Sequence, residues 1–205
     1  MADNVVTLPG RGKTYLKGPN RTPGSTYGVS IALEGIRKTF KDVDYSSTDS
    51  IKPPRSGGDV ECILVRNTSG IALLPGRAVI WASTYQGRRV DGYTHQDWDV
   101  NQPCAGIVDE FLPTAGVADD DLFWIVVKGP ALALKALSSA TLSKDVHVMA
   151  ITAATSQATS AGRIVTFAQT SAVTQATNGV LNRIGIAMST SNTTGASVLV
   201  YVDLV

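Results

Sequence analysis

From residue 58 onward the chain is a series of short apolar runs separated by glycine, proline, asparagine or serine. Several runs alternate apolar and polar residues, as in Val60, Cys62 and Leu64. A period of two places every second side chain on one face of a β-strand, whereas a helix needs a spacing of three or four residues. The pattern predicts an all-β fold: a β-sandwich, a jelly roll or a small β-barrel. The predicted strands are residues 59–67, 77–83, 88–93, 103–111, 122–129, 131–137, 145–151, 162–169, 182–189 and 197–205, of which 131–137 also fits a helical turn.

The composition agrees with this class. Charged residues make up 17% of the chain, against about 25% in an average domain, which argues against a Lys- and Glu-rich helical bundle. No run of 18 apolar residues predicts a membrane span, and the first residues do not resemble a secretory signal. We therefore expect synthesis in a reducing cytoplasm. There Cys62 and Cys104 are interpreted as small core residues, and a single disulfide bridge between them is the alternative.

The first 57 residues differ from the rest in charge. They hold nine Lys or Arg and five Asp or Glu, whereas residues 58–137 hold six and ten. The early part is rich in glycine and proline and predicts an extended N-terminal arm, which either is solvated or binds an acidic partner surface. Nucleic acid is not the expected partner, because no aromatic platform accompanies the charges. The basic residues near the start are Arg11, Lys13, Lys17 and Arg21, against the single acid Asp3.

This charge and composition suggest a division into residues 1–57, arm and linker, and residues 58–205, a β-rich body. Within 1–57, residues 26–40 form one short element whose spacing fits a helix and a strand equally well. The body contains an internal sequence repeat: a strand, a Gly-Arg hairpin, a Gly-Ile strand and a closing apolar strand occur twice. The two possible related halves are 58–137 and 138–205.

The chain lacks a recognisable catalytic set, so we do not expect an enzyme, a cofactor or a metal. Residues 8–14, LPGRGKT, lack the first glycine of a phosphate-binding loop, and the residues that follow cannot form its helix. Of two histidines, His95 is expected in solvent and His147 in strand packing. The one carboxylate cluster, Asp109, Glu110 and residues 119–121, matches no calcium loop. It predicts a solvated turn or an acidic patch that faces the basic arm.

The stretch CAGIVDEFLPTAGVADDDLFWIVVKGPALAL, residues 104–134, has a Gly-Ile strand, an acidic turn and an apolar strand that ends in Val-Lys-Gly. In this it resembles the decoration, or cement, proteins of tailed-bacteriophage capsids. Residues 67–82 and 182–205 are similar to the same family, so the resemblance covers about residues 58–205. It implies a sandwich, jelly roll or small barrel, often trimeric, on the outer surface of a virion.

Resemblance and charge together predict a structural virion protein that stabilises a phage capsid by bridging major capsid subunits. A homotrimer would sit on the shell, with no membrane or nucleic-acid partner. Its arm would lie along acidic capsid surface, and 22 extended residues reach up to about 75 Å. The arm residues predicted to bind the capsid are Arg11, Lys13, Lys17 and Arg21.

An alternative belongs to another class of protein: a carbohydrate- or receptor-binding β-module of a phage head or tail fibre. Trp98 lies in a polar loop and is a possible interface anchor. With Tyr85 and Tyr93 it would stack on sugar rings. Loss of glycan binding in a Trp98→Ala variant would distinguish this alternative from capsid decoration.

Overall fold

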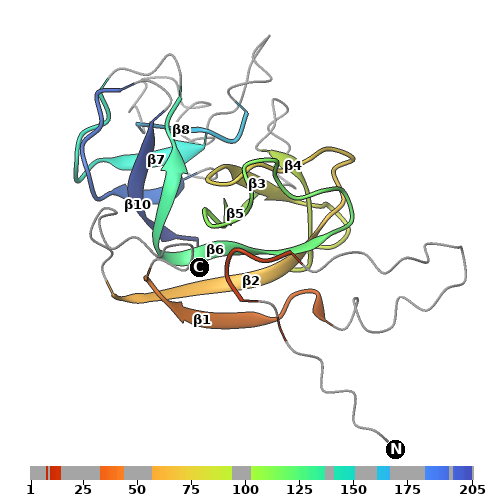
Figure 1. Cartoon of the computed structure of the whole chain (residues 1–205). Helices are drawn as coiled ribbons and strands as arrows, with labels where there is room; N and C mark the ends of the chain where they lie inside the picture. The colour runs from red at the N-terminus through yellow and green to blue at the C-terminus, as the bar shows by residue number, and fades with distance from the viewer. Residues whose placement is uncertain are drawn as a thin grey trace, which may run out of the picture.

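The described part of the chain is built from β-strands in a single mixed sheet, as a computed structural model shows (Figure 1). The structure describes residues 8, 10–14, 33–43, 57–93, 103–136, 141–150, 161–166, 183–193 and 196–204. The all-β fold predicted from the alternating pattern is therefore confirmed. The strands are β1 (Arg37–Lys41), β2 (Asp59–Asn67), β3 (Ala78–Trp81), β4 (Arg89–Tyr93), β5 (Cys104–Val108), β6 (Leu122–Leu134), β7 (His147–Ala150), β8 (Ile164–Thr166), β9 (Arg183–Ala187) and β10 (Ser197–Asp203).

Strand pairing closes the first part of the sheet on itself. The order of neighbours is β2-β4-β3-β5-β6, and β6 pairs in turn with β2. Every contact is antiparallel except β2 with β4, which is parallel. The result is a barrel-like ring of five strands, here called the first unit, residues 59–128. A closed ring leaves few strand edges exposed to solvent.

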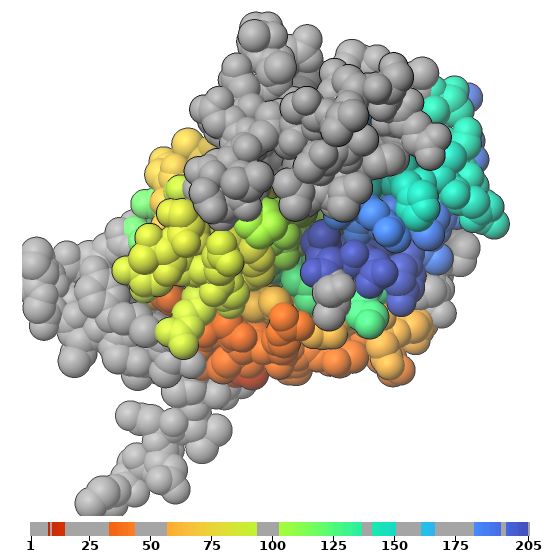
Figure 2. Space-filling model, turned by 180° about the vertical axis from the view of Figure 1, so that it is seen from behind, coloured from red at the N-terminus to blue at the C-terminus, as the bar shows by residue number. Residues whose placement is uncertain are grey.

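A second ring repeats this arrangement. Its neighbours follow the order β6-β10-β9-β7-β8, and one parallel bridge, Lys135 to Ile164, returns from the end of β6 to β8. This is the second unit, residues 128–203. Figure 2 shows cyan residues of this unit on one side of the molecule and yellow residues of the first unit on the other.

The two units correspond residue by residue. In the first, Val79 pairs with Gly106, and the register shifts directly after Val79. In the second, Val148 pairs with Gly185, and the register shifts directly after Val148. The bridge Leu73–Val117 likewise has its counterpart in Leu142–Ser191. The internal repeat in the sequence thus corresponds to two rings with the same strand order, β4-β3-β5-β6 and β8-β7-β9-β10.

The two units meet inside β6. Residues 122–128 of β6 pair with β2, and residues 128–134 pair with β10. Residues 131–137, for which sequence allowed strand or helical turn, thus continue this strand as far as Leu134. Gly129 has φ +98° where the strand passes from one ring to the other, and a Cβ there would overlap the Asp59 carbonyl oxygen. Only glycine fits this position.

Each ring has its own apolar interior. One cluster contains Val79, Phe123 and Ile125 inside the first unit, whereas the matching positions of the second unit, Val148, Val198 and Val200, belong to the other cluster. That cluster also covers the outer face of the first unit, where Phe40 of β1 meets Trp124 edge to face at 5.2 Å between ring centroids.

The element of undecided type in residues 26–40 contains a strand at its end, because β1 occupies Arg37–Lys41. β1 pairs antiparallel with β2 and so extends the sheet of the body. The division into an arm of residues 1–57 and a body of residues 58–205 stays a prediction. β1 belongs to the first range by sequence, but it pairs with β2 of the second.

Candidate functional site

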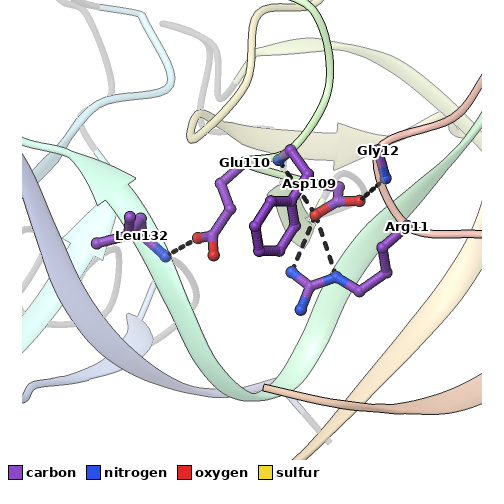
Figure 3. Close-up of polar contacts among 6 residues, drawn as sticks. Arg11, Gly12, Asp109, Glu110 and Leu132 are labelled. Carbon is purple, nitrogen blue, oxygen red and sulfur yellow. Dashed lines mark hydrogen bonds and ion pairs between the residues drawn. The ribbon is translucent and has the colours of Figure 1, made fainter. Parts of the chain in front are cut away.

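The clearest polar site joins the N-terminal segment to the body (Figure 3). Asp109, just after β5, accepts hydrogen bonds at Oδ1 from Arg11 Nε at 3.2 Å and from an Arg11 terminal nitrogen at 2.9 Å. Its Oδ2 accepts one from the Gly12 backbone N–H at 2.7 Å. Both charged side chains have no solvent exposure. The carboxylate therefore holds two consecutive residues of the N-terminal segment.

The surroundings of Arg11 favour its charged form. Burial, the largest single influence, lowers the pKa of Arg11, but neighbouring charges, led by Asp109, give a net upward direction. The guanidinium also lies 4.7 Å from the centre of the Phe111 ring, within cation–π range. A buried ion pair with these extra contacts fixes where the segment sits more than it adds net stability.

The same turn has a second contact with the body. The Leu132 backbone N–H of β6 donates to a carboxylate oxygen of Glu110 (Figure 3). In the second unit the residue corresponding to Asp109 is Met188, because Asp109 N–H donates to Trp124 and Met188 N–H donates to the equivalent Leu199. The acid is therefore present only on the unit that the N-terminal segment covers.

A further buried cluster holds the segment that precedes β1. Glu34 accepts hydrogen bonds from Arg66 of β2 and Arg89 of β4, with nitrogen–oxygen distances of 2.5 and 2.8 Å. Arg66 also donates to the Asp120 carbonyl oxygen at 2.8 Å. Residues 10–14 and 33–43 thus both pack on the first unit through buried charges.

Arg11, predicted to bind the capsid, is 3% exposed, and its guanidinium pairs with Asp109 of its own chain. The physical reason is the buried carboxylate of Asp109, which needs a cation beside it. The role of Arg11 in capsid binding stays a prediction. Lys13 is exposed, as a partner-binding residue requires. Lys17, Arg21 and Trp98 lie outside the described residues.

The acidic cluster separates into different environments. Asp109 faces the basic segment, as one of the two sequence interpretations expected, whereas Asp119 accepts a hydrogen bond from the Gly70 N–H. Within the described residues, no group of three or more His, Cys, Asp or Glu side chains is placed to hold a metal ion.

Both cysteines are free and buried, which agrees with core residues and not with the alternative of a disulfide bridge. Burial raises the pKa of the Cys62 thiol to about 12, and burial likewise raises that of Cys104 to about 12. Neither thiol is therefore a reactive thiolate at neutral pH.

The aromatic residues considered for sugar stacking have other contacts. The Tyr93 hydroxyl donates to the Ala72 carbonyl oxygen and accepts from the Leu74 N–H, while its ring lies 4.9 Å from the Arg77 guanidinium. Tyr85 is 47% exposed as a residue, but the Arg89 guanidinium lies 4.2 Å from the centre of its ring. His147, which the sequence analysis expected to be packed inside a strand, is instead exposed on β7.

Sequence reasoning missed Glu34, Arg66 and Arg89 as a site. A single acid in an otherwise apolar stretch, GVSIALEGI, is the signal that was present. Its partners are 32 and 55 residues away, so no local spacing connects them.

The fold and the site together define a class: an all-β protein of two corresponding five-stranded units, with an N-terminal segment held on the first unit by buried ion pairs. No protein-family model matches the chain, and no curated protein sequence matches it. Among the described residues, no helix is long and apolar enough to cross a membrane.

Proposed function

We propose that this protein is a structural component of a phage virion that binds the outer surface of the capsid and bridges major capsid subunits. The observation that carries the proposal is the attachment of a basic N-terminal segment to a closed all-β body. Arg11 and Gly12 hold the segment at Asp109, and the next residue, Lys13, is exposed. Lys17 and Arg21 follow within eight residues.

The fold supports a binding role over a catalytic one. Two buried acids pair with buried cations: Asp109 with Arg11 and Glu34 with Arg66. Those pairs fix segments of the chain in place. The stretch that carries the resemblance, residues 104–134, forms β5, the acidic turn and the strand shared by both units. It is thus the structural centre of the molecule.

The test is binding to empty shells of the cognate major capsid protein, measured by co-sedimentation at low and moderate salt. A triple variant, Lys13→Ala, Lys17→Ala and Arg21→Ala, removes the arm charges but keeps Arg11 on Asp109. We expect binding at least tenfold weaker, because many modest contacts add along the arm. Deleting the whole arm is a poorer test, because it leaves Asp109 buried without its cation.

A matched control removes three exposed cations from other surfaces: Lys38→Ala, Arg88→Ala and Lys144→Ala. Its net charge equals that of the arm variant, so a difference between the two isolates position from charge. Equal binding by the arm variant and the unaltered protein contradicts the arm mechanism. Absence of binding by the unaltered protein contradicts the capsid role itself.

A further inference from the structure

Because the two units correspond residue by residue, their outer faces can be compared directly. On the first unit, Trp124, Val126 and Ile107 point away from the ring interior and are at most 1% exposed. Phe40 and other residues of the N-terminal segments contribute to this cover, and Leu8 and Ile36 pack against the same cluster. The apolar outer face of the first unit is thus kept from solvent by a covering layer of other residues of the chain.

The matching face of the second unit is partly open. Tyr201, which corresponds to Val126, is 42% exposed, and its neighbour across the sheet, Ile186, is half-buried. Leu199 and Leu132 pair across β10 and β6 and are half-buried as well. Along β10, alternate residues are fully buried, so the exposed set is one continuous face and not scattered side chains.

The charges at the border of this face indicate what covers it. Lys128 and Asp203 pair across β6 and β10 at one end, and both are exposed. Arg183 on β9 is exposed too. An acidic partner surface would favour a border of basic residues alone. A border with both signs suits a second copy of the same surface, where a cation of one chain meets an acid of the other.

We propose that the outer face of the second unit, centred on Leu132, Leu199, Tyr201 and Ile186, is the contact between copies of this chain. It supplies the layer that the N-terminal segments supply on the first unit. A contact between like surfaces pairs two chains, so it differs from the homotrimer that the resemblance implies; it goes beyond the proposed virion role, and its test uses no capsid. Failure here and failure of capsid binding are therefore separate results.

The first test is native mass by light scattering over a range of protein concentrations. We expect the unaltered protein to be oligomeric and Tyr201→Lys to have the mass of one chain, with at least a tenfold rise in the dissociation constant. The matched control is Ile71→Lys, because Ile71 is an exposed apolar residue of the first unit, at 50%. Far-ultraviolet circular dichroism confirms that each variant is folded.

A second measurement does not depend on disrupting the contact. In a Tyr201→Cys variant, maleimide labelling should slow as protein concentration rises, whereas an Ile71→Cys variant should label at one rate throughout. The native thiols are buried and label slowly in both. A monomeric protein at all concentrations overturns the proposal. So does a Tyr201→Lys variant that keeps its oligomeric mass.

Discussion

At the scale of single residues, the most consequential feature is one buried carboxylate. Asp109 has no solvent exposure and accepts three hydrogen bonds from two adjacent residues that are 97 and 98 positions away in the chain. A buried charge without a partner is strongly unfavourable, so the fold and the N-terminal segment depend on each other here. Arg11 is thereby an anchor, and the proposed partner binding rests on Lys13, Lys17 and Arg21 instead.

Removing one member of this pair should destabilise the protein strongly. We expect Asp109→Leu to lower the free energy of unfolding by about 3–5 kcal/mol, because it leaves the Arg11 guanidinium buried without its counter-ion. Asp109→Asn should cost less, since it keeps an acceptor for Gly12. Urea denaturation checks both variants. A double variant, Arg11→Met with Asp109→Leu, should recover much of the loss.

An exposed ion pair provides the control for this prediction. Lys41 and Asp59 lie 2.6 Å apart, but both side chains are 65% exposed. Lys41→Ala should therefore change the free energy of unfolding by less than about 1 kcal/mol. If Asp109→Leu is no more harmful than Lys41→Ala, Arg11 does not anchor the segment in solution.

At the scale of elements, two glycines occupy equivalent positions on β5 and β9. A Cβ on Gly106 would lie 2.7 Å from the Val126 carbonyl oxygen, and one on Gly185 would overlap the Tyr201 carbonyl oxygen. Val126 and Tyr201 are themselves equivalent. Both rings thus need a residue without a side chain where the neighbouring strand passes closest.

We expect Gly185→Ala to lower the free energy of unfolding by about 3 kcal/mol, the upper end for overpacking, because the obstructing atom belongs to the backbone and cannot rotate away. Thermal denaturation followed by circular dichroism checks this. Gly10→Ala is the control, since a Cβ there meets nothing within 4 Å. A Gly185→Ala variant as stable as the control would show that β9 and β10 are further apart than the structure places them.

The same scale shows what the sequence could predict. Every predicted strand range of the body contains or contributes to an observed strand, because period-two alternation is a local property. β6 was divided in two by Gly129 and Pro130, which usually mark a turn; here they let one strand bend between rings. Pairing partners, register and the Arg11–Asp109 contact depend on residues distant in the chain, so local patterns do not encode them.

At the scale of the whole molecule, the two units are physically coupled. They share β6, and the second unit's Gly162 carbonyl oxygen accepts a hydrogen bond from the Ala78 N–H of β3 at 2.7 Å. Arg77 of the first unit also donates to the Ala161 carbonyl oxygen at 3.0 Å. Loss of either ring would expose edges and apolar surface of the other, which favours a single cooperative unfolding transition.

The distribution of tryptophan makes this coupling measurable. All three tryptophans, Trp81, Trp98 and Trp124, fall in the sequence of the first unit. Tryptophan fluorescence thus reports the first unit, whereas circular dichroism reports both. In the Gly185→Ala variant, whose lesion lies in the second unit, we expect both signals to shift to the same lower urea midpoint. If the fluorescence midpoint stays that of the unaltered protein while the dichroism midpoint falls, the units unfold independently, and the shared strand joins two separately stable bodies.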